Sequence, residues 1–430
     1  MQEKMGMALE GIKVIDCSQV AAVPMAARML GDFGADVIHI ENPTTGDYWR
    51  VFKDVQAEQS AACPSDFDYN WENYNRNKRS LTLDLSRDNG RAIIHRMVQE
   101  ADVFLSNLRS FELERFQVDY QTLEKINPRI IWGNVNGYGK AGPDKDLPAY
   151  DATAYWARAG FPYIMSQPGI PSFGYRPAIG DNVVGMSLAF GIMQALYVRE
   201  KTGIGQEVSV SLLHTGIFQN GFDISGALVT GLDPADWREQ PPAELVQQSM
   251  TAIAQVMAFY GAKAKSPLTG LYMTKDARAL IFIILQPDRY WVKFCKAVGR
   301  EDLSNNPSYN TIEGRAENIT ELRAIFSEIF ITKTYEEWHP LLEGIPYAPN
   351  QSLREVINDP QARASGCFVS YDHPQCGRIE QIANPIMMSK TPSSVRLPAP
   401  EFGQHTEEVL LEHGYTWEDI VGFKEDGSIA

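Results

Sequence analysis

The chain has 430 residues, a formal net charge of −15 at pH 7 and an isoelectric point near 5.0. Such acidity argues against nucleic acid as the main partner, because surfaces that bind nucleic acid are basic. The hydrophobic fraction of 44% and the charged fraction of 22% are typical of a soluble globular protein. The length is sufficient for two domains.

The cysteines and the distribution of apolar residues indicate the compartment. Five cysteines show neither metal-ligand spacing nor a disulfide framework, so reduced thiols are expected. No apolar run reaches membrane-spanning length, and residues 1–10 lack the apolar core of a signal peptide. We therefore expect a cytoplasmic protein without a membrane partner.

The first half of the chain alternates short apolar strands with helices. Residues 12–16 predict a strand, residues 24–33 a helix that begins on proline, and residues 36–41 a second strand. Further strands are predicted at residues 81–85, 103–105, 130–133 and 207–212. This pattern predicts an open α/β sheet, in which ligands bind at the carboxyl ends of the strands.

Several familiar catalytic motifs are missing. The turn from Cys17 to Val23 has no glycine, so the GxGxxG signature is absent and a nicotinamide or flavin enzyme of that type is disfavoured. The sequence has neither a GxSxG elbow nor a Walker loop. None of the seven histidines pairs with another at metal-ligand spacing, and we expect no metal.

One helix carries a candidate nucleophile. Residues 183–198 are almost all apolar or small and contain no proline, which predicts a largely buried helix. Asp181 lies at its head, where an N-cap residue belongs. Gly180 and Gly185 are expected to leave open space for a bulky ligand. In a dry cleft this carboxylate can attack an activated acyl group, whereas the alternative is an ordinary helix cap.

Basic side chains lie near the ends of the predicted strands. Lys78, Arg79, Arg109 and Arg115 are singly typical of a solvated surface, but together along one sheet edge they can hold a nucleotide phosphate. Asp151, thirty residues before Asp181, is by default another helix cap.

A set of short motifs recurs in one order along nearly the whole chain. They are residues 9–16, 30–38, 77–85, 101–107, 137–143, 180–181 and 202–206, with His405 in the tail. Together they resemble class III CoA-transferases, the family of formyl-CoA transferase, carnitine CoA-transferase and α-methylacyl-CoA racemase. Residues 142–148 are most similar to transferases that act on aryl- or alkyl-2-hydroxy acids, such as phenyllactate.

The resemblance implies a chemistry for Asp181, on which the family's catalytic aspartate falls. Attack on an acyl-CoA thioester gives an aspartyl mixed anhydride and CoA thiolate, and the thiolate returns to make an aspartyl-CoA thioester before the acceptor carboxylate reacts. Both intermediates hydrolyse easily, so the site must exclude water. Coenzyme A and acyl-CoA enter as substrates, and no permanently bound cofactor is implied.

The resemblance also places the coenzyme A contacts after the predicted strands. They fall on Val20, Ala21, Ala22, Asn42, Leu83, Ser86, Asn107, Leu108, Arg109, Arg115, Phe116, Tyr150 and Asp151. Leu83 and Phe116 are expected to flank adenine, and Arg115 is expected to meet phosphate.

Three positions depart from formyl-CoA transferase. Ala21, Asn42 and Pro148 stand where that enzyme has glutamine, arginine and lysine. The remaining phosphate contact is therefore assigned to Arg79, Arg87 or Arg109.

The implied architecture is a large Rossmann-like α/β domain built from both chain ends, a smaller α+β domain and an interlocked homodimer. We predict the N-terminal part of the large domain at residues 1–220, a linker at 221–265 and the small domain at 266–344. Residues 345–430 are predicted as a return linker and the C-terminal part of the large domain. A mixed complex with a different partner chain is left open.

Three functions are compared. CoA transfer between two carboxylates is favoured. Acyl-CoA racemisation or isomerisation is disfavoured, because the histidine of the racemase His–Asp pair is replaced by Tyr150, and a phenol is a poor proton shuttle at neutral pH. A non-catalytic acyl-CoA-binding partner subunit is disfavoured by the retention of Asp181.

The sequence does not identify the donor or acceptor acid. Aromatic residues between Asp151 and Asp181 either line an acyl pocket for a bulky or aryl group or belong to the core. They are Tyr155, Trp156, Phe161, Tyr163 and Phe173.

Overall fold

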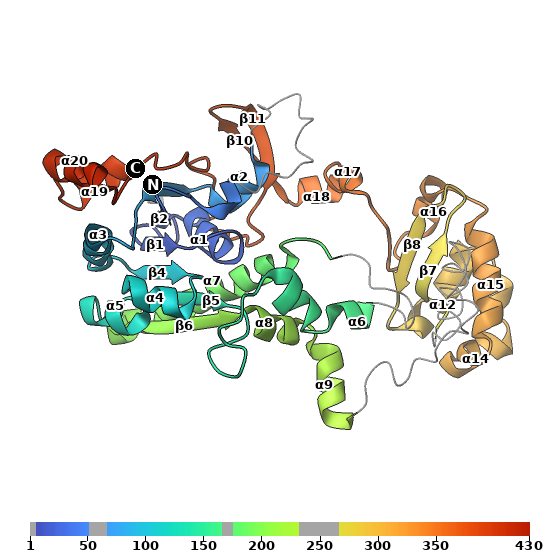
Figure 1. Cartoon of the computed structure of the whole chain (residues 1–430). Coiled ribbons are helices and arrows are strands. Elements are labelled where there is room, and N and C mark those ends of the chain that lie inside the picture. The colour runs from blue at the N-terminus through green and yellow to red at the C-terminus, as the bar shows by residue number, and fades with distance from the viewer. Residues whose placement is uncertain (1–5, 51–66, 166–174, 232–265) are drawn as a thin grey trace. The chain divides into compact units, whose positions relative to one another are not determined.

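A six-stranded parallel sheet lies at the centre of the larger of two units in the computed structural model (Figure 1). The structure describes residues 6–50, 67–165, 175–231 and 266–430. The strands are β1 (Lys13–Cys17), β2 (Asp36–Glu41), β3 (Lys78–Thr82), β4 (Val103–Ser106), β5 (Ile131–Asn136) and β6 (Gln206–Ser211). Their order, β3-β2-β1-β4-β5-β6, is that of a doubly wound α/β fold and reverses between β1 and β4. The predicted open α/β sheet is confirmed.

Both faces of the sheet are buried, which explains why its strands read as short apolar runs. Successive residues point to opposite faces. Val14 and Leu105 join one apolar cluster, whereas their neighbours Ile15 and Phe104 join another. The sheet is therefore the middle layer of three.

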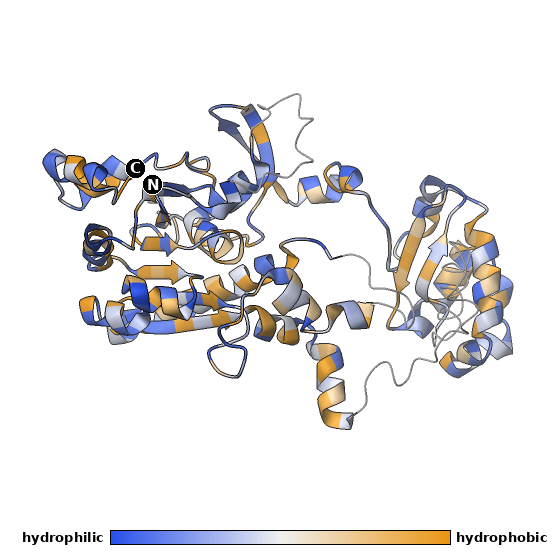
Figure 2. Cartoon of the chain, in the orientation of Figure 1, coloured by the Kyte–Doolittle hydropathy of each residue, from blue (hydrophilic) through white to orange (hydrophobic). Residues whose placement is uncertain are grey.

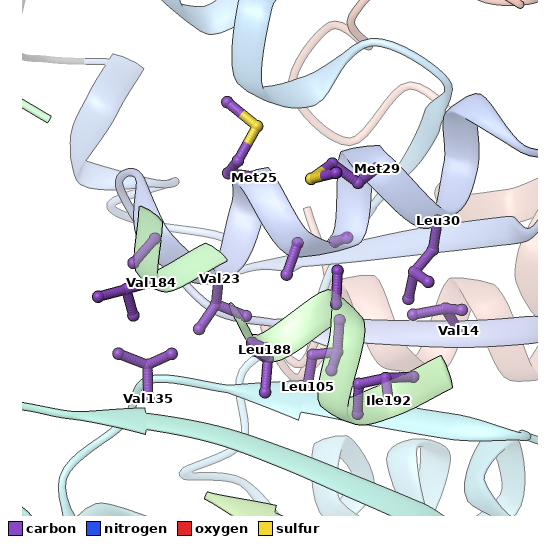
Figure 3. Close-up of a cluster of buried hydrophobic side chains, with 14 of the residues drawn as sticks. Val14, Val23, Met25, Met29, Leu30, Leu105, Val135, Val184, Leu188 and Ile192 are labelled. Carbon is purple, nitrogen blue, oxygen red and sulfur yellow. The ribbon is translucent and has the colours of Figure 1, made fainter. Parts of the chain in front are cut away.

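Helices α1 (Ala22–Asp32) and α7 (Ile179–Thr202) cover one face. Figure 3 shows Val23 of α1 close to Leu188 of α7, and Val14 of β1 between Leu30 of α1 and Ile192 of α7. Every residue of α1 is buried. This apolar contact holds the two helices together on the sheet.

Gly185 of α7 contradicts the expectation of open space. A Cβ atom at this position would lie 2.5 Å from the carbonyl oxygen of Ala22 and 2.9 Å from the Cβ of Met25. The glycine therefore permits the close approach of α7 to the first turn of α1, and no room for a ligand is left there.

The opposite face is covered by helices from both ends of the chain. They are α3 (Asp88–Val98), α4 (Ser110–Phe116), α5 (Tyr120–Ile126), α19 (Thr406–Glu412) and α20 (Trp417–Glu425). Val409 and Leu410 of α19 share a cluster with Ile93 and Ile94 of α3. The C-terminal segment is therefore part of the larger unit, which takes residues 1–167, 172–236 and 364–430.

Shorter elements complete the larger unit. They are η1 (Tyr48–Arg50), α2 (Tyr69–Asn75), the π-helical segment η3 (Asp151–Ala157), α6 (Phe161–Met165), α8 (Leu212–Gln219), α9 (Gly221–Thr230) and the antiparallel hairpin of β10 (Phe368–His373) and β11 (Gly377–Ile382). Helix α9 begins where a linker is predicted, and residues 232–265 of that predicted linker lie outside the described residues.

The smaller unit takes residues 168–171 and 237–363. Its antiparallel sheet comprises β7 (Thr269–Met273), β8 (Ala279–Ile283) and β9 (Tyr347–Pro349). Its helices are α12 (Pro287–Ala297), α13 (Glu301–Ser304), η5 (Pro307–Tyr309), α14 (Ile312–Glu317), α15 (Ile319–Phe330), α16 (Tyr335–Leu341) and α17 (Leu353–Val356), and α18 (Pro360–Ala364) follows at the boundary. Strand β9 lies beyond residue 344, where the small domain is predicted to end, because Ala348 pairs with Ile281.

A buried polar cluster connects the first three strands. Lys78 Nζ and His39 Nδ1 lie 2.8 and 2.9 Å from the same oxygen, Asp16 Oδ2, and all three side chains are fully buried. Burial opposes ionisation of Asp16, but Lys78 and His39 outweigh it and hold the pKa of this carboxyl well below its usual range. Burial also acts to lower the pKa of His39, yet the charge of Asp16 raises it to about 9.

Helix α7 also differs from the expectation that no apolar run reaches membrane-spanning length. With 24 residues, it is the one helix of the described part of the chain that is long and apolar enough to cross a membrane. Core helices of globular proteins meet the same criterion. Because Val184, Leu188 and Ile192 are fully buried in the cluster with α1, we interpret α7 as a core helix.

The close α1–α7 contact predicts an asymmetric effect of two Gly→Ala changes. Gly185→Ala is expected to lower the free energy of unfolding by about 1–3 kcal/mol, because the new methyl group overlaps Ala22. Gly422→Ala in α20, where the added Cβ meets no atom within 4 Å, is expected to raise it by about 0.5–1 kcal/mol. Chemical denaturation measures both, and an undiminished stability of Gly185→Ala would contradict the packing.

Candidate active site

Asp181 lies inside the first turn of α7 and is not its cap, which corrects the prediction. The helix begins at Ile179, and its N-cap position is Ala178, a left-handed residue with φ of 65° that makes no side-chain cap. Because Asp181 is two residues inside the helix, its carboxylate is not required as a cap. The ordinary structural explanation for this aspartate is therefore removed.

The capping role belongs to Asp151, which comes from a different element. Asp151 is the first residue of η3 and is only 3% exposed. Its Oδ2 accepts the backbone N–H of Gly180 at 3.3 Å, whereas its Oδ1 has no hydrogen-bond partner among the described residues. Asp151 is therefore a buried carboxylate at the start of α7, instead of the cap of its own helix. Helix segments of the π type often mark functional sites.

Gly180 makes this arrangement possible. A Cβ at Gly180 would lie 2.2 Å from Asp151 Oδ1 and 2.4 Å from the ring of Tyr155. The predicted open space beside Gly180 is filled by these two side chains. The glycine thus allows Asp151 to come up against the first turn of α7.

The two carboxylates share one desolvated region. Burial, and then the negative charge of Asp151, raise the pKa of Asp181 to about 7. Burial also raises the pKa of Asp151. Hydrogen bonds from the backbone N–H groups of Gly180, Ala178 and Asp181 act in the opposite direction and lower it, but burial outweighs them. Near neutrality, Asp181 therefore exists in both charge states and is easily converted to the ionised form.

Two tyrosines face this pair. The Tyr74 hydroxyl, on α2, donates to Asn182 Oδ1 at 2.9 Å, and the side chain is 3% exposed. Burial and the charge of Asp181 raise the pKa of Tyr74, so this phenol stays a donor. Burial, and then Asp151 and Asp181, raise the pKa of Tyr175 to about 12. Sequence reasoning missed Tyr74, because the polar, aperiodic residues around α2 give no helix signal.

An aromatic group adjoins the carboxylates. Tyr155 and Trp156 of η3 stack on Phe161 with ring centroids 5.0 and 5.1 Å apart, and Tyr175 meets Trp156 edge to face at 6.1 Å. Because Tyr155 also lies against Gly180, this group belongs to the same region as Asp181. Tyr163 is exposed, and Phe173 lies outside the described residues.

The fold brings most of the predicted coenzyme A residues to one edge of the sheet. Each group follows the carboxyl end of a strand: Val20, Ala21 and Ala22 after β1, Asn42 after β2, Leu83 and Ser86 after β3, and Asn107, Leu108 and Arg109 after β4. The loops after β1 and β4 are joined where the strand order reverses: Gln19 N–H donates to Asn107 Oδ1 at 3.1 Å, and Asn107 Nδ2 donates to the Gln19 carbonyl oxygen at 2.7 Å.

Asp181 is adjacent to this edge through helix packing. Gly185, one turn after Asp181 on the same side of α7, lies directly against Ala22. The nucleophile candidate and the loop after β1 therefore belong to a single region of the larger unit.

Arg79 contradicts its predicted role. Its guanidinium donates to Asp36 at 3.0 and 2.6 Å and to Glu408 and Glu412 at 3.2 and 2.8 Å. Three carboxylates neutralise it, and it connects β2 to α19 instead of offering charge to a phosphate. Arg87 is likewise paired, with Asp84 at 3.3 Å.

The other predicted contacts have different environments. Arg109 and Arg115 are exposed at the two ends of α4, and no carboxylate pairs with either among the described residues. The Arg115 guanidinium lies 5.6 Å from the ring centre of Phe116. Asn42 Oδ1 accepts the N–H of Thr44 at 2.9 Å and so forms a turn. Tyr150 is largely exposed.

The arrangement defines a doubly wound α/β protein with a carboxylate pair, buried Asp151 and half-buried Asp181, in its larger unit beside the switch point of the sheet. A family model for CoA-transferase family III matches residues 9–406, and the chain belongs to this family. It is therefore a CoA-transferase, and CoA thioesters are its substrates. The predicted family and enzyme class are confirmed.

Relatives of known activity match over nearly the whole chain. (R)-2-Hydroxy-4-methylpentanoate CoA-transferase from Clostridioides difficile is 33% identical over 423 residues, 97% of this chain and 98% of the relative. Cinnamoyl-CoA:phenyllactate CoA-transferase from Clostridium sporogenes is 30% identical, covering 97% and 96%. Formyl-CoA:oxalate CoA-transferase from Rhodopseudomonas palustris is 29% identical, covering 98% and 97%.

Solved structures share the fold. A CAIB/BAIF family protein from Brucella suis is 24% identical, with a TM-score of 0.75 over 95% of this chain and 100% of that chain. Rv3272 from Mycobacterium tuberculosis is 23% identical, with a TM-score of 0.76 over 94% and 99%.

The raised pKa of Asp181 predicts a pH-dependent gain in stability for Asp181→Asn. The folded state holds this proton more tightly than the unfolded state, so the parent loses stability as pH rises from about 4 through about 7. Between pH 5 and pH 8, the free energy of unfolding of Asp181→Asn should rise relative to that of the parent by about 2 kcal/mol. Denaturation at several pH values measures this change.

The matched control is Asp88→Asn. Asp88 is also a first-turn aspartate, of α3, but its side chain is 97% exposed. The control should show no comparable pH trend. A flat difference between the parent and Asp181→Asn would contradict the burial of the Asp181 carboxylate.

Proposed function

We propose that the enzyme moves CoA from an acyl-CoA thioester to a free carboxylic acid through covalent intermediates on Asp181. An Asp181 oxygen attacks the thioester carbonyl carbon, the C–S bond breaks, and an acyl-aspartyl anhydride and CoA thiolate form. The thiolate attacks the aspartyl carbonyl and releases the donor acid. The acceptor carboxylate then attacks the aspartyl-CoA thioester, which forms a second anhydride and frees the CoA thiolate. The thiolate finally attacks the acceptor acyl carbon, which gives the new acyl-CoA and regenerates Asp181.

The observation that carries this proposal is the position of the half-buried Asp181 beside the buried Asp151, next to the loop after β1. Partial burial desolvates the nucleophile and also limits access of water, which would hydrolyse the anhydride and thioester. Repulsion from Asp151 disfavours the ionised form of Asp181, and acylation removes that charge. The same pair therefore supports nucleophilic attack without a separate base.

The coenzyme A grip is proposed for the same sheet edge. Val20, Ala21 and Ala22 are placed at the thioester end, because Ala22 lies directly against Gly185, one turn after Asp181 on α7. Leu83 and Phe116 are proposed to flank adenine. Arg109 and Arg115, which no described carboxylate neutralises, are proposed to meet the phosphates.

The acid exchanged is proposed to be a 2-hydroxy acid with an apolar alkyl or aryl side chain. Two relatives are named for such acids, 2-hydroxy-4-methylpentanoate and phenyllactate. The aromatic group of Tyr155, Trp156 and Phe161 beside Asp181 supports an apolar acyl pocket. Panels of CoA donors and carboxylate acceptors identify the pair with the highest kcat/KM.

Removal of the nucleophile gives the most direct kinetic test. Asp181→Ala is expected to lower CoA transfer by at least about a thousandfold, because no other covalent route is available, while coenzyme A still binds. Transfer between a labelled acid and an acyl-CoA, together with calorimetric titration of coenzyme A, measures both properties. Asp88→Ala is the matched control and should transfer at the parent rate. Near-parental transfer by Asp181→Ala would overturn the assignment.

We further propose that the enzyme is a homodimer, interlocked as the family resemblance implies. Apolar side chains on α7, α8 and α9 are strongly exposed in the single chain, and Figure 2 shows α9 as predominantly hydrophobic. They include Phe190, Phe218, Phe222, Leu228 and Val229, with Phe222 94% exposed. Large apolar side chains exposed on successive helices support an interface with another chain.

The dimer proposal is tested by charge substitution. Phe222→Asp is expected to weaken dimerisation, measured by analytical ultracentrifugation, because it places a carboxylate in an apolar contact. Val421→Asp, at an exposed position on α20, should sediment as the parent does. A monomeric parent would contradict the proposal.

A further inference from the structure

The loop after β1 contains a residue in an unfavourable conformation. Val20 has φ of 68°, in the left-handed region that β-branched residues avoid. It precedes Ala21 and Ala22, where α1 begins. A conformation of this cost persists only when surrounding contacts hold it.

Asp47 supplies those contacts. Its carboxylate is buried, and its two oxygens lie 3.1 and 3.2 Å from the Val20 nitrogen, which donates to them. Asp47 Oδ1 also accepts the backbone N–H of Trp49 at 2.7 Å. One side chain from the segment after β2 therefore fixes the loop after β1.

Asp47 is itself held from two sides. His39 Nε2 lies 3.3 Å from Asp47 Oδ2, and its other ring nitrogen contacts Asp16. On the other side, the Asp47 N–H donates to Glu41 Oε2 at 3.1 Å, and Arg50 donates to Glu41 at 2.6 and 2.8 Å. A buried series of opposite charges thus extends from Lys78 through Asp16 and His39 to Asp47.

We propose that Asp47 is a positioning residue for acyl-CoA, which holds Val20 and thereby Ala21 and Ala22 in the conformation that receives the thioester end of the substrate. This inference rests on the proposed function, because it takes the loop after β1 as the coenzyme A contact. Asp47 acts through the backbone of Val20 and does not itself meet substrate. The packing of Gly185 against Ala22 makes the position of this loop relevant to Asp181.

Five variants, one of them Val20→Gly alone, separate positioning from general stability. Asp47→Ala removes the acceptor for Val20 N–H, whereas Asp47→Asn keeps one oxygen for that bond. In Asp47→Ala/Val20→Gly, residue 20 reaches positive φ without steric cost. Asp32→Asn is the matched control, because Asp32 is also buried and multiply bonded but ends α1 at its far end.

Calorimetric titration with coenzyme A is the measurement. We expect Asp47→Ala to raise the Kd roughly tenfold, because the loop is released and a buried donor loses its partner. The Kd values of Asp47→Asn and Asp32→Asn should stay within about threefold of the parent value. The Kd of Asp47→Ala/Val20→Gly should lie within about threefold of the Kd of Val20→Gly alone. Hydrogen exchange of residues 18–25 should accelerate in Asp47→Ala and not in Asp32→Asn.

An unchanged Kd in Asp47→Ala, or failure of Val20→Gly to restore binding, would overturn the inference. If Asp47→Ala does not fold, Asp47→Ser, whose shorter side chain cannot span to Val20, takes its place with the same expected outcomes. Failure of the parent itself to bind coenzyme A would instead overturn the proposed function, so the two failures are distinguishable.

Discussion

The structure depends on two carboxylates that share the first turn of one helix. Asp151 accepts the backbone N–H of Gly180, and Asp181 projects from the same first turn of α7. Desolvating two neighbouring carboxylates is unfavourable unless packing enforces it, and the α1–α7 contact on the parallel sheet provides that enforcement. Burial and the proximity of Asp151 destabilise the ionised form of Asp181. This ionised form attacks the thioester in the proposed mechanism.

The sheet determines what lies around this pair. Its order reverses between β1 and β4, and the loops after these strands are joined by hydrogen bonds between Gln19 and Asn107. Buried polar groups behind β1 and β2, from Lys78 to Asp47, extend this organisation to Val20. The apolar layers supply stability, and the polar contacts specify the conformation of the loop after β1.

Most strands of the sheet were predictable from the sequence, whereas the contacts between distant residues were not. The exception is β3, which spans Lys78–Thr82 and not the predicted residues 81–85. β2 was predicted with its observed bounds, because a buried parallel strand is a continuous apolar run between turn residues. The start of α7 was missed, since Ala178 in a left-handed conformation carries no sequence signal. The helix pattern alone makes Asp181 a candidate nucleophile or cap, and the family resemblance favours the nucleophile. The proximity of its buried neighbour Asp151 depends on a contact across 29 residues, which the sequence does not show. Arg79 was misassigned because sequence cannot show that Asp36, Glu408 and Glu412 converge on it.

Covalent trapping tests the central claim most directly. The enzyme is incubated with the best CoA donor and hydroxylamine, digested, and its peptides are analysed by mass spectrometry. Acylation of Asp181 predicts a hydroxamate on the peptide that contains this residue and its absence from Asp181→Ala treated in the same way. A hydroxamate confined to another carboxylate, such as Asp151, while transfer proceeds at the parent rate would contradict the account.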